Sequence, residues 1–296
     1  MKRWILMVAI LVSVAAATVG QTPPSGTAPT SAQLQQRVEA YVRKLYAWGP
    51  SFQVVVGMPK DSTVPGFYEV IVQVTAGGQS DTGTVWVSKD GRFLLRGEVN
   101  DLTVDPFAAA RRLIKLEGSA SHGPADARVV VVDYSDFQCP HCRQLDTELR
   151  ALTARYPQVR FVSKHFPLSQ IHPWAMTAAT AAWCANRQKP EAYWAFHHLL
   201  FDNQDNITTE NAWQKVQDLA GQAGFDSGAI RTCMASPEAK AAIEADLKEG
   251  VALSIANTPT VFINGRRVVG GDRNILEQFI SYELAVSAAP PTLRRP

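Results

Sequence analysis

The sequence predicts an α/β domain in its C-terminal half, preceded by a small α+β N-terminal domain. After about residue 50 the hydrophobic period changes from that of a helix to the period of two that is typical of antiparallel strands. An unbroken run of valines at 129–132 is typical of a strand covered on both faces. This strand leads directly into "DFQCPHC" at 136–142, and a helical pattern follows.

Composition limits the classes of function. The chain has 296 residues, 46% of them hydrophobic, which is enough for one large domain or two modest ones. Lys and Arg number 29 against 27 Asp and Glu, and no Lys/Arg run exceeds two residues. A nucleic-acid partner is therefore not favoured. Four cysteines are too few to staple a miniature fold, so apolar cores must hold the chain together.

Residues 1–20 are typical of a secretory signal peptide. Lys2 and Arg3 precede an apolar or small stretch at 4–17, and Ala15 and Ala17 fit a small-x-small cleavage site. The alternative is an uncleaved anchor, but a spanning helix needs about 20 apolar residues. We therefore expect a periplasmic or otherwise extracytoplasmic protein, whose compartment permits disulfides.

A linker at 21–32, rich in Pro, Thr and Ser, leads to a small α+β domain at 33–103. One helix, ended by Gly49-Pro50, is followed by four predicted strands. These strands lie at 52–58, 67–75, 82–88 and 92–99, and Lys89-Asp90-Gly91 marks a turn between the last two. The domain contains no Cys or His, so its contribution must be binding, spacing or self-association.

Residues 104–124 predict a connecting helix with a small-residue loop. Asp105 suits its N-cap, Pro106 its first position and Gly118 its end. The second domain, 125–286, has strands at 129–132 and 159–166 around a helix at 143–156. Helical patterns then fill 174–256, a hairpin turns at Asn264-Gly265 and a last helix closes the domain. We expect the tail at 287–296 to be disordered.

The Cys-Pro-His-Cys stretch predicts a redox centre. Cys139 would lie at a helix N-terminus, where unpaired N–H groups and the helix dipole favour a thiolate and depress its pKa. Pro140 has no N–H to leave unpaired in the first turn, and His141 adds a donor or a positive charge. Cys142, one turn inside, can close a disulfide onto Cys139. A stabilised thiolate favours the reduced form, so this disulfide would be an oxidant.

Two other interpretations of the pair are weaker. A zinc site needs further ligands at matching spacing, and Cys184 and Cys233 do not form a second CxxC. A purely structural disulfide between Cys139 and Cys142 would close too small a ring to stabilise the chain. We therefore expect no metal and no cofactor.

Strand, Cys-Pro-His-Cys and helix, followed far downstream by Thr258-Pro259 before a hairpin, resemble the thioredoxin fold. The helical insertion of about 85 residues, with the motif itself, resembles the DsbA family of exported thiol:disulfide oxidoreductases over 125–285. The resemblance implies that Pro259 is a cis-proline facing the sulfurs and that Thr258 contacts the substrate chain. It also implies that Asp133 is a buried acid that takes the proton of Cys142.

Several residues keep an alternative. Asp133 could be a strand-end residue bonded to a loop, and Lys164 could pair with it or lie on the surface. Cys184 and Cys233, on helices with apolar neighbours, predict a structural disulfide, or else two buried thiols. His172 is expected at a helix boundary. His197 and His198 are expected to pack or to face solvent rather than to bind metal. The aromatics of the insertion are expected to lie in the core; these are Trp183, Tyr193, Trp194 and Phe196.

Three functions stay open at this point. The motif and the long insertion favour an oxidase that introduces disulfides into unfolded or misfolded exported polypeptides, with a membrane quinone-linked thiol oxidase as redox partner. The N-terminal domain resembles that of the DsbC and DsbG isomerases, and Thr before the proline fits an isomerase or reductase; these would be homodimers served by a membrane reductase. The third alternative is a periplasmic chaperone or binding module whose cysteines are incidental.

Overall fold

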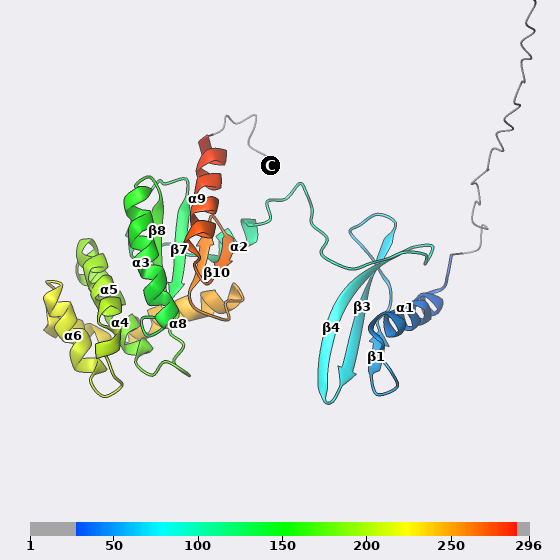
Figure 1. Ribbon diagram of the computed structural model, residues 1–296, viewed down its shortest axis with the longest axis horizontal. Coiled ribbons are helices and arrows are strands. Elements are labelled where there is room, and N and C mark those ends of the chain that lie inside the picture. Colours follow the sequence, from blue (N-terminus) through cyan, green and yellow to red (C-terminus); the bar gives the residue numbers. More distant parts are fainter. Residues whose placement is uncertain (1–27, 289–296) are drawn as a thin grey trace, which may run out of the picture. The chain divides into compact units, whose positions relative to one another are not determined.

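A computed structural model describes residues 28–288, which form two compact units that divide between Asn100 and Asp101 (Figure 1). The predicted signal peptide at 1–20 and residues 289–296 of the predicted tail lie outside the described residues. Among residues 28–288, no helix is both long enough and apolar enough to cross a bilayer. The predicted mixed α/β architecture is confirmed.

The N-terminal unit is one helix on an antiparallel sheet. Helix α1 (Ser31–Tyr46) begins with a capping box, in which Thr30 and Gln33 exchange side-chain to backbone hydrogen bonds. Its apolar stripe buries Leu34 and Val38 against the sheet. The strands are β1 (Gln53–Val56), β2 (Lys60–Asp61), β3 (Phe67–Ala76), β4 (Gln79–Ser88) and β5 (Leu94–Leu95), in the order β1-β3-β4-β5 with β2 beside β3.

Strand β5 is much shorter than the strand predicted at 92–99. It pairs with β4 at Trp86 and Val87, after a turn in which the Ser88 hydroxyl bonds the Asp90 carboxylate. Beyond this pairing, residues 79–85 of β4 pair with β3 on one side and with no strand on the other, within the described part of the chain. The sheet of this unit therefore has an open edge.

The C-terminal unit is a five-stranded sheet between two layers of helices, in the order β10-β9-β7-β8-β6. Its strands are β6 (Ser121–His122), β7 (Val130–Ser135), β8 (Arg160–His165), β9 (Thr260–Ile263) and β10 (Arg266–Val269). Its helices are α2 (Ala108–Leu113), α3 (Pro140–Arg155), α4 (Ala175–Gln188), α5 (Tyr193–Asp202), α6 (Ala212–Gln222), α7 (Ser227–Met234), α8 (Pro237–Ala252) and α9 (Arg273–Ala288), with short 3-10 turns at Pro190–Ala192 and Gln204–Asn206. Strands β7 and β8 are parallel, and the other pairs are antiparallel.

Alternation along β7 and β8 divides the core between the two faces of the sheet. Val131 and Phe161 pack with the leucines of α3 and with α9. Val132 and Val162 point the other way and pack with Phe166 and the α8 end of the insertion. The insertion itself gathers around the alanine-rich helix α4, beside the sheet (Figure 1).

The connecting helix predicted at 105–118 is wrong in length and in role. Helix α2 covers only Ala108–Leu113, and the Asp105 carboxylate accepts from the backbone N–H of Phe107 and pairs with Arg111 in the turn before it. From Ile114 the backbone is extended, and Ile114 packs on the core of the C-terminal unit. The segment is thus part of the C-terminal unit and not a helix that connects two domains.

The insertion contains a disulfide between Cys184 on α4 and Cys233 on α7, with 5.9 Å between the Cα atoms. The two cysteines are 49 residues apart in sequence. We expect Cys184→Ala/Cys233→Ala to lower the free energy of unfolding by about 4 kcal/mol, the loop-closure entropy of such a crosslink. Urea denaturation of the double variant measures this. Alkylation of both cysteines in unreduced, denatured wild-type protein would contradict the bond.

Candidate active site

The candidate site lies where β7 passes into α3. Cys139 is the N-cap residue of α3, with an extended backbone, and Pro140 is the first residue of the helix. Pro140 and His141 are exposed, whereas Cys139 and Cys142 are 5% and 1% exposed. The helix start therefore presents one sulfur close to the surface and holds the other inside.

The surroundings of the two thiols act in opposite directions. A hydrogen bond from the Cys142 side chain is the largest cause that lowers the pKa of Cys139, and the backbone N–H groups of Cys142 and His141 add to it. Together they outweigh burial and lower that pKa to about 5. Burial raises the pKa of Cys142 well above its ordinary value. At neutral pH the pair therefore favours a thiolate on Cys139 and a thiol on Cys142.

The Thr258–Pro259 loop faces this pair. Its peptide bond is cis, and the Thr258 carbonyl oxygen lies 3.5 Å from Sγ of Cys139. The loop is held there because β9 pairs with β7 in a register that sets Thr260 opposite Tyr134. Thr258 is 8% exposed, and its hydroxyl has no hydrogen-bond partner within the described structure.

Asp133 is buried on β7, on the face of the sheet that packs against α3. It is 6% exposed, and its Oδ1 atom has no hydrogen-bond partner in the described residues. Burial is the largest cause that raises its pKa, to about 8, and the charge of Asp146 adds to the shift. A carboxyl group with such a pKa can give or take a proton near neutral pH.

Lys164 is neither the partner of Asp133 nor a surface residue. The register sets Asp133 opposite Ser163, so that Lys164, the next residue on β8, points to the other face. There it is 3% exposed and its ammonium lies 2.9 Å from Asp246 and 3.1 Å from Glu249, both on α8. Asp133 therefore has no lysine to lower its pKa.

Two residues that the sequence analysis did not identify brace the active-site loop. Asp136 is 1% exposed and accepts hydrogen bonds from the backbone N–H of Gln138 at 2.7 Å and of Leu168 at 2.8 Å. Its carboxylate also lies 2.7 Å from Nδ1 of His172, so that this helix-boundary histidine has a specific partner. The sequence signal for Asp136 is an aspartate at the start of a turn, because an Asp side chain there commonly accepts a hydrogen bond from the backbone N–H two residues later.

Gln204 is the second bracing residue, and it comes from the insertion. Its side-chain amide donates to the carbonyl oxygens of Phe137 at 2.8 Å and of Cys139 at 3.0 Å. No sequence signal marks it, because it lies 65 residues from Cys139. The aromatics of the insertion pack as predicted: Tyr193 and Phe196 are fully buried, and Trp183 and Trp194 are partly buried against the same core.

A family model described as thioredoxin matches residues 115–280, which is more than half of the chain. The chain belongs to the thioredoxin family. Among solved structures, it is similar to a thioredoxin-like oxidoreductase from Silicibacter pomeroyi, with 26% identity, a TM-score of 0.50, and coverage of 58% of this chain and 95% of that one. The thioredoxin fold of this chain is thus shared with a protein described as an oxidoreductase.

Two further structures share the fold at lower identity. The BdbD protein of Bacillus subtilis is 22% identical, with a TM-score of 0.52 over 58% of this chain and 95% of that one. The thiol-disulfide exchange protein alpha-DsbA2 of Wolbachia pipientis is 17% identical, with a TM-score of 0.52 over 60% of this chain and 96% of that one. The predicted resemblance to DsbA-like proteins is confirmed at the level of fold.

The curated relatives are much longer proteins. A Na(+)/H(+) antiporter of Salinispora tropica, NhaA 3, is 37% identical over 145 residues, which are 49% of this chain and 21% of the antiporter. Another, from Mycolicibacterium vanbaalenii, is 32% identical and matches 58% of this chain and 28% of its own length. The chain thus spans about a fifth to a quarter of these relatives. Their name describes them as whole proteins and does not assign transport to this chain.

Asp133→Asn tests the buried acid through stability. Between pH 3.8, the ordinary pKa of the group, and about 8, the folded chain keeps a proton that the unfolded chain has lost, so stability falls as pH rises through this window. Asn cannot ionise. The stability of Asp133→Asn relative to the wild type should therefore rise with pH across the window, by up to about 1.4 kcal/mol per unit, and level off above it.

Urea midpoints of the two oxidised proteins at a series of pH values measure this difference. A difference that is independent of pH would contradict a raised pKa. The same substitution should slow the attack of Cys142 on a mixed disulfide, because Asp133 is the carboxyl group expected to take the proton of Cys142 in that step.

Gln204→Leu tests whether the Gln204 side chain stabilises the active-site loop. It leaves the carbonyl oxygen of Phe137 buried without its side-chain donor, which should cost about 1–3 kcal/mol of unfolding free energy, whereas the carbonyl oxygen of Cys139 still accepts from the backbone N–H of Arg143. Gln214→Leu is the matched control, since that side chain is exposed and bonds Asp218 within its own helix. Urea unfolding compares the two variants, and equal losses would show that Gln204 does not brace the loop.

Proposed function

We propose that this protein is an extracytoplasmic thiol:disulfide oxidoreductase that introduces disulfides into exported polypeptides. Cys139 would exchange with the substrate and Cys142 would be its resolving partner. The observation that supports this best is the opposed pKa of the two thiols at one helix start, lowered for Cys139 and raised for Cys142. Nucleophile and leaving group in disulfide exchange are thiolates, so this asymmetry assigns different roles to the two sulfurs.

The reaction starts from the Cys139–Cys142 disulfide. A substrate thiolate attacks Sγ of Cys139, the S–S bond breaks, and its electron pair goes to Cys142, which takes a proton from Asp133. A second substrate thiolate then attacks the substrate sulfur of the mixed disulfide, and Cys139 leaves as a thiolate. The substrate loses two electrons and gains a disulfide, while the enzyme ends as thiolate and thiol, with Asp133 taking up a proton from solvent.

The direction of exchange follows from the stability of the products. The low pKa of Cys139 stabilises the reduced enzyme, which makes its disulfide oxidising. The substrate backbone would lie along the Thr258–Pro259 loop, beside the attacked sulfur. To work again the enzyme must be reoxidised, for which we propose a membrane quinone-linked thiol oxidase.

One observation favours an isomerase or reductase of the DsbC or DsbG type as second candidate. The edge of β4 at residues 79–85 offers unpaired N–H and C=O groups, and two such edges can pair about a two-fold axis. A dimer that screened the reactive sulfurs from a membrane oxidase would limit reoxidation, which favours isomerisation. Light scattering on the mature protein separates the two: we expect a monomer, and a dimer would favour the isomerase.

The decisive experiment is trapping. Cys142→Ala, mixed with a reduced unfolded secreted protein in excess oxidant, should accumulate a mixed disulfide through Cys139, visible by mass spectrometry without reductant, because Cys142 can no longer release the substrate by attacking Sγ of Cys139. Cys139→Ser is the control and should trap nothing. Wild-type protein should leave oxidised substrate and no adduct. If Cys139→Ser suppressed aggregation and oxidised the substrate as the wild type does, the cysteines would be incidental to a chaperone.

A further inference from the structure

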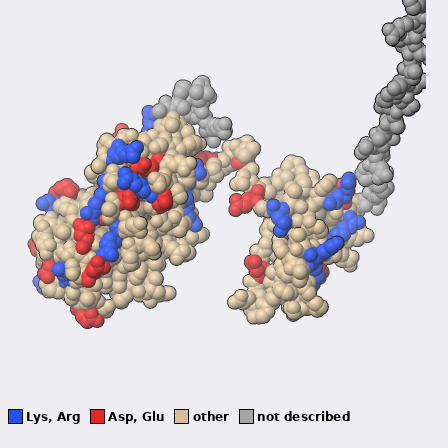
Figure 2. Space-filling view, viewed as in Figure 1, with Lys and Arg blue, Asp and Glu red and all other residues tan. Residues whose placement is uncertain are grey.

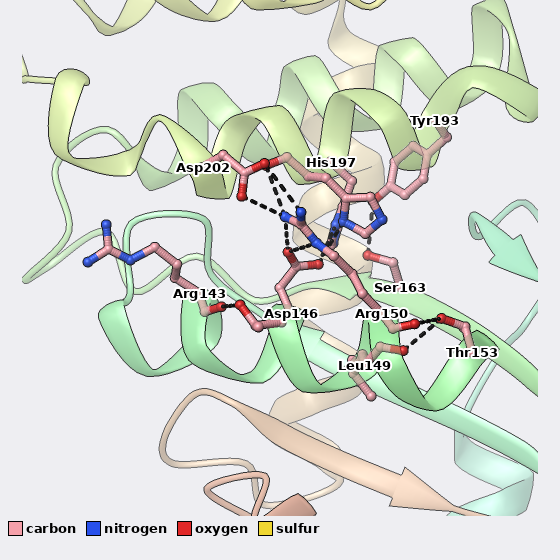
Figure 3. A network of polar contacts seen from close by, with 11 residues as sticks. Arg143, Asp146, Leu149, Arg150, Thr153, Ser163, Tyr193, His197 and Asp202 are labelled. Atoms are coloured by element: carbon pink, nitrogen blue, oxygen red, sulfur yellow. Dashed lines mark hydrogen bonds and ion pairs between the residues drawn. The ribbon is translucent and has the colours of Figure 1, made fainter. Parts of the chain in front are cut away.

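A cluster of two histidines and an aspartate lies between α3 and α5, apart from the two reactive sulfurs. Asp146 is on α3, and His197 and His198 are consecutive on α5 (Figure 3). Nδ1 of His198 lies 2.9 Å from Oδ1 of Asp146, and Nδ1 of His197 lies 3.3 Å from the same oxygen. One ligand atom from each residue lies within 4.8 Å of the other two.

His197 is the unsatisfied member of the cluster. It is 2% exposed, and neither ring nitrogen has a hydrogen bond in the described structure, since Nδ1 is close to Asp146 but not aligned with it. Aromatic rings enclose it, with Phe137, Trp194 and Phe201 at centroid distances of 5.2, 5.0 and 5.1 Å. Buried polar atoms are nearly always bonded, and an exception indicates a missing water or ion.

The carboxylate is already oriented toward the histidines. Arg150 binds the other oxygen, Oδ2, through Nε at 2.8 Å and an Nη atom at 2.5 Å, and Asp202 holds Arg150 at 2.8 Å (Figure 3). A carboxylate with one oxygen bonded to Arg150 and the other turned toward the histidines has the orientation that a metal ligand needs.

We propose that Asp146, His197 and His198 bind one divalent transition-metal ion, with zinc as the best match. Two imidazoles and one carboxylate suit zinc, with ligand distances of about 2.0–2.2 Å, and do not suit Mg²⁺ or Ca²⁺. The ion would bind Oδ1 of Asp146 and Nδ1 of each histidine. It would give the Nδ1 atom of His197 the partner that it lacks.

A cavity provides access and room for a fourth ligand. It measures about 140 Å³ and is lined by Asp146, His198, Arg150 and Trp194, among others. A water molecule bound there would complete a tetrahedron. Asp202 balances the charge of Arg150, so the cluster keeps one net negative charge from Asp146 for the incoming cation.

On the face of the C-terminal unit shown in Figure 2, basic and acidic side chains alternate over short distances, without a broad acidic field. The site therefore depends on its ligand geometry and not on the general field of the protein.

The test uses the mature, untagged protein with both disulfides closed, so that Cys139 and Cys142 offer no thiolates. Zinc titration by calorimetry should show one ion bound per chain, and Co²⁺ should give the visible absorption of a four-coordinate site. Zinc at a hundredfold its dissociation constant should multiply the ratio of folded to unfolded protein about a hundredfold. Absence of binding by either metal would overturn the proposal.

Three variants assign the site. His198→Ala, with a side chain only 29% exposed at a helix surface, should fold and lose at least a hundredfold in affinity. Arg150→Lys, which alters the support of Asp146, should lose 10–100-fold. His122→Ala is the control, since His122 lines the same cavity but lies outside the cluster, and its affinity should not change. Binding that survives His198→Ala, or that is lost in His122→Ala, would place the metal elsewhere and overturn the assignment.

Discussion

The pairing of β7 with β9 is the constraint on which the candidate site depends. It brings Cys139 and Thr258, 119 residues apart in sequence, to a sulfur–oxygen distance of 3.5 Å. In the register that does this, Asp133 pairs with Val261 and Tyr134 with Thr260, so that β7 ends and β9 begins at the same end of the sheet. A shift of one residue would turn every β7 side chain to the opposite face and remove Asp133 from the side of α3. The valine-rich core on both faces of β7 makes such a shift costly.

Polar and apolar residues together hold the loop before α3. Phe137 and Cys139 are at most 5% exposed and pack in the core of the insertion, and two buried polar side chains fix the backbone around them. Asp136 fixes it to Leu168 and His172, and Gln204 fixes its carbonyl oxygens from the insertion. The insertion thus contributes directly to the geometry of the reactive cysteine, and the Cys184–Cys233 bond, which joins α4 to α7, stabilises the body that carries this brace.

Structural features that depend on a short stretch of sequence could be predicted. Features that depend on which face of the sheet or helix a residue occupies could not. The helix at Ser31–Tyr46, the valine strand and the Cys-Pro-His-Cys helix start each follow from local pattern, and the fold class from their order. The length of α2 could not be predicted, because the backbone becomes extended at Ile114, whose side chain packs on the core of the C-terminal unit. Nor could the position of Lys164, which a register difference of one residue places against α8. His197 and His198 looked like packing residues because Asp146, which faces both, lies on another helix.

Asp133 and Asp146 show how one layer of the protein sets two buried carboxyl groups to opposite protonation states. Both lie between the sheet and α3 and line the same cavity. Burial acts to raise the pKa of Asp146, but His197 and His198 outweigh it and hold that pKa below the usual range. Asp133 has no cationic partner among the described residues, and burial raises its pKa to about 8. The ionised Asp146 is itself one cause of that rise. A cation bound at Asp146 would therefore lower the pKa of Asp133, which lies beneath Cys142 in the proposed exchange. Metal binding at Asp146 and thiol exchange at Cys142 would in that case be coupled through the charges of the two carboxyl groups that line the cavity.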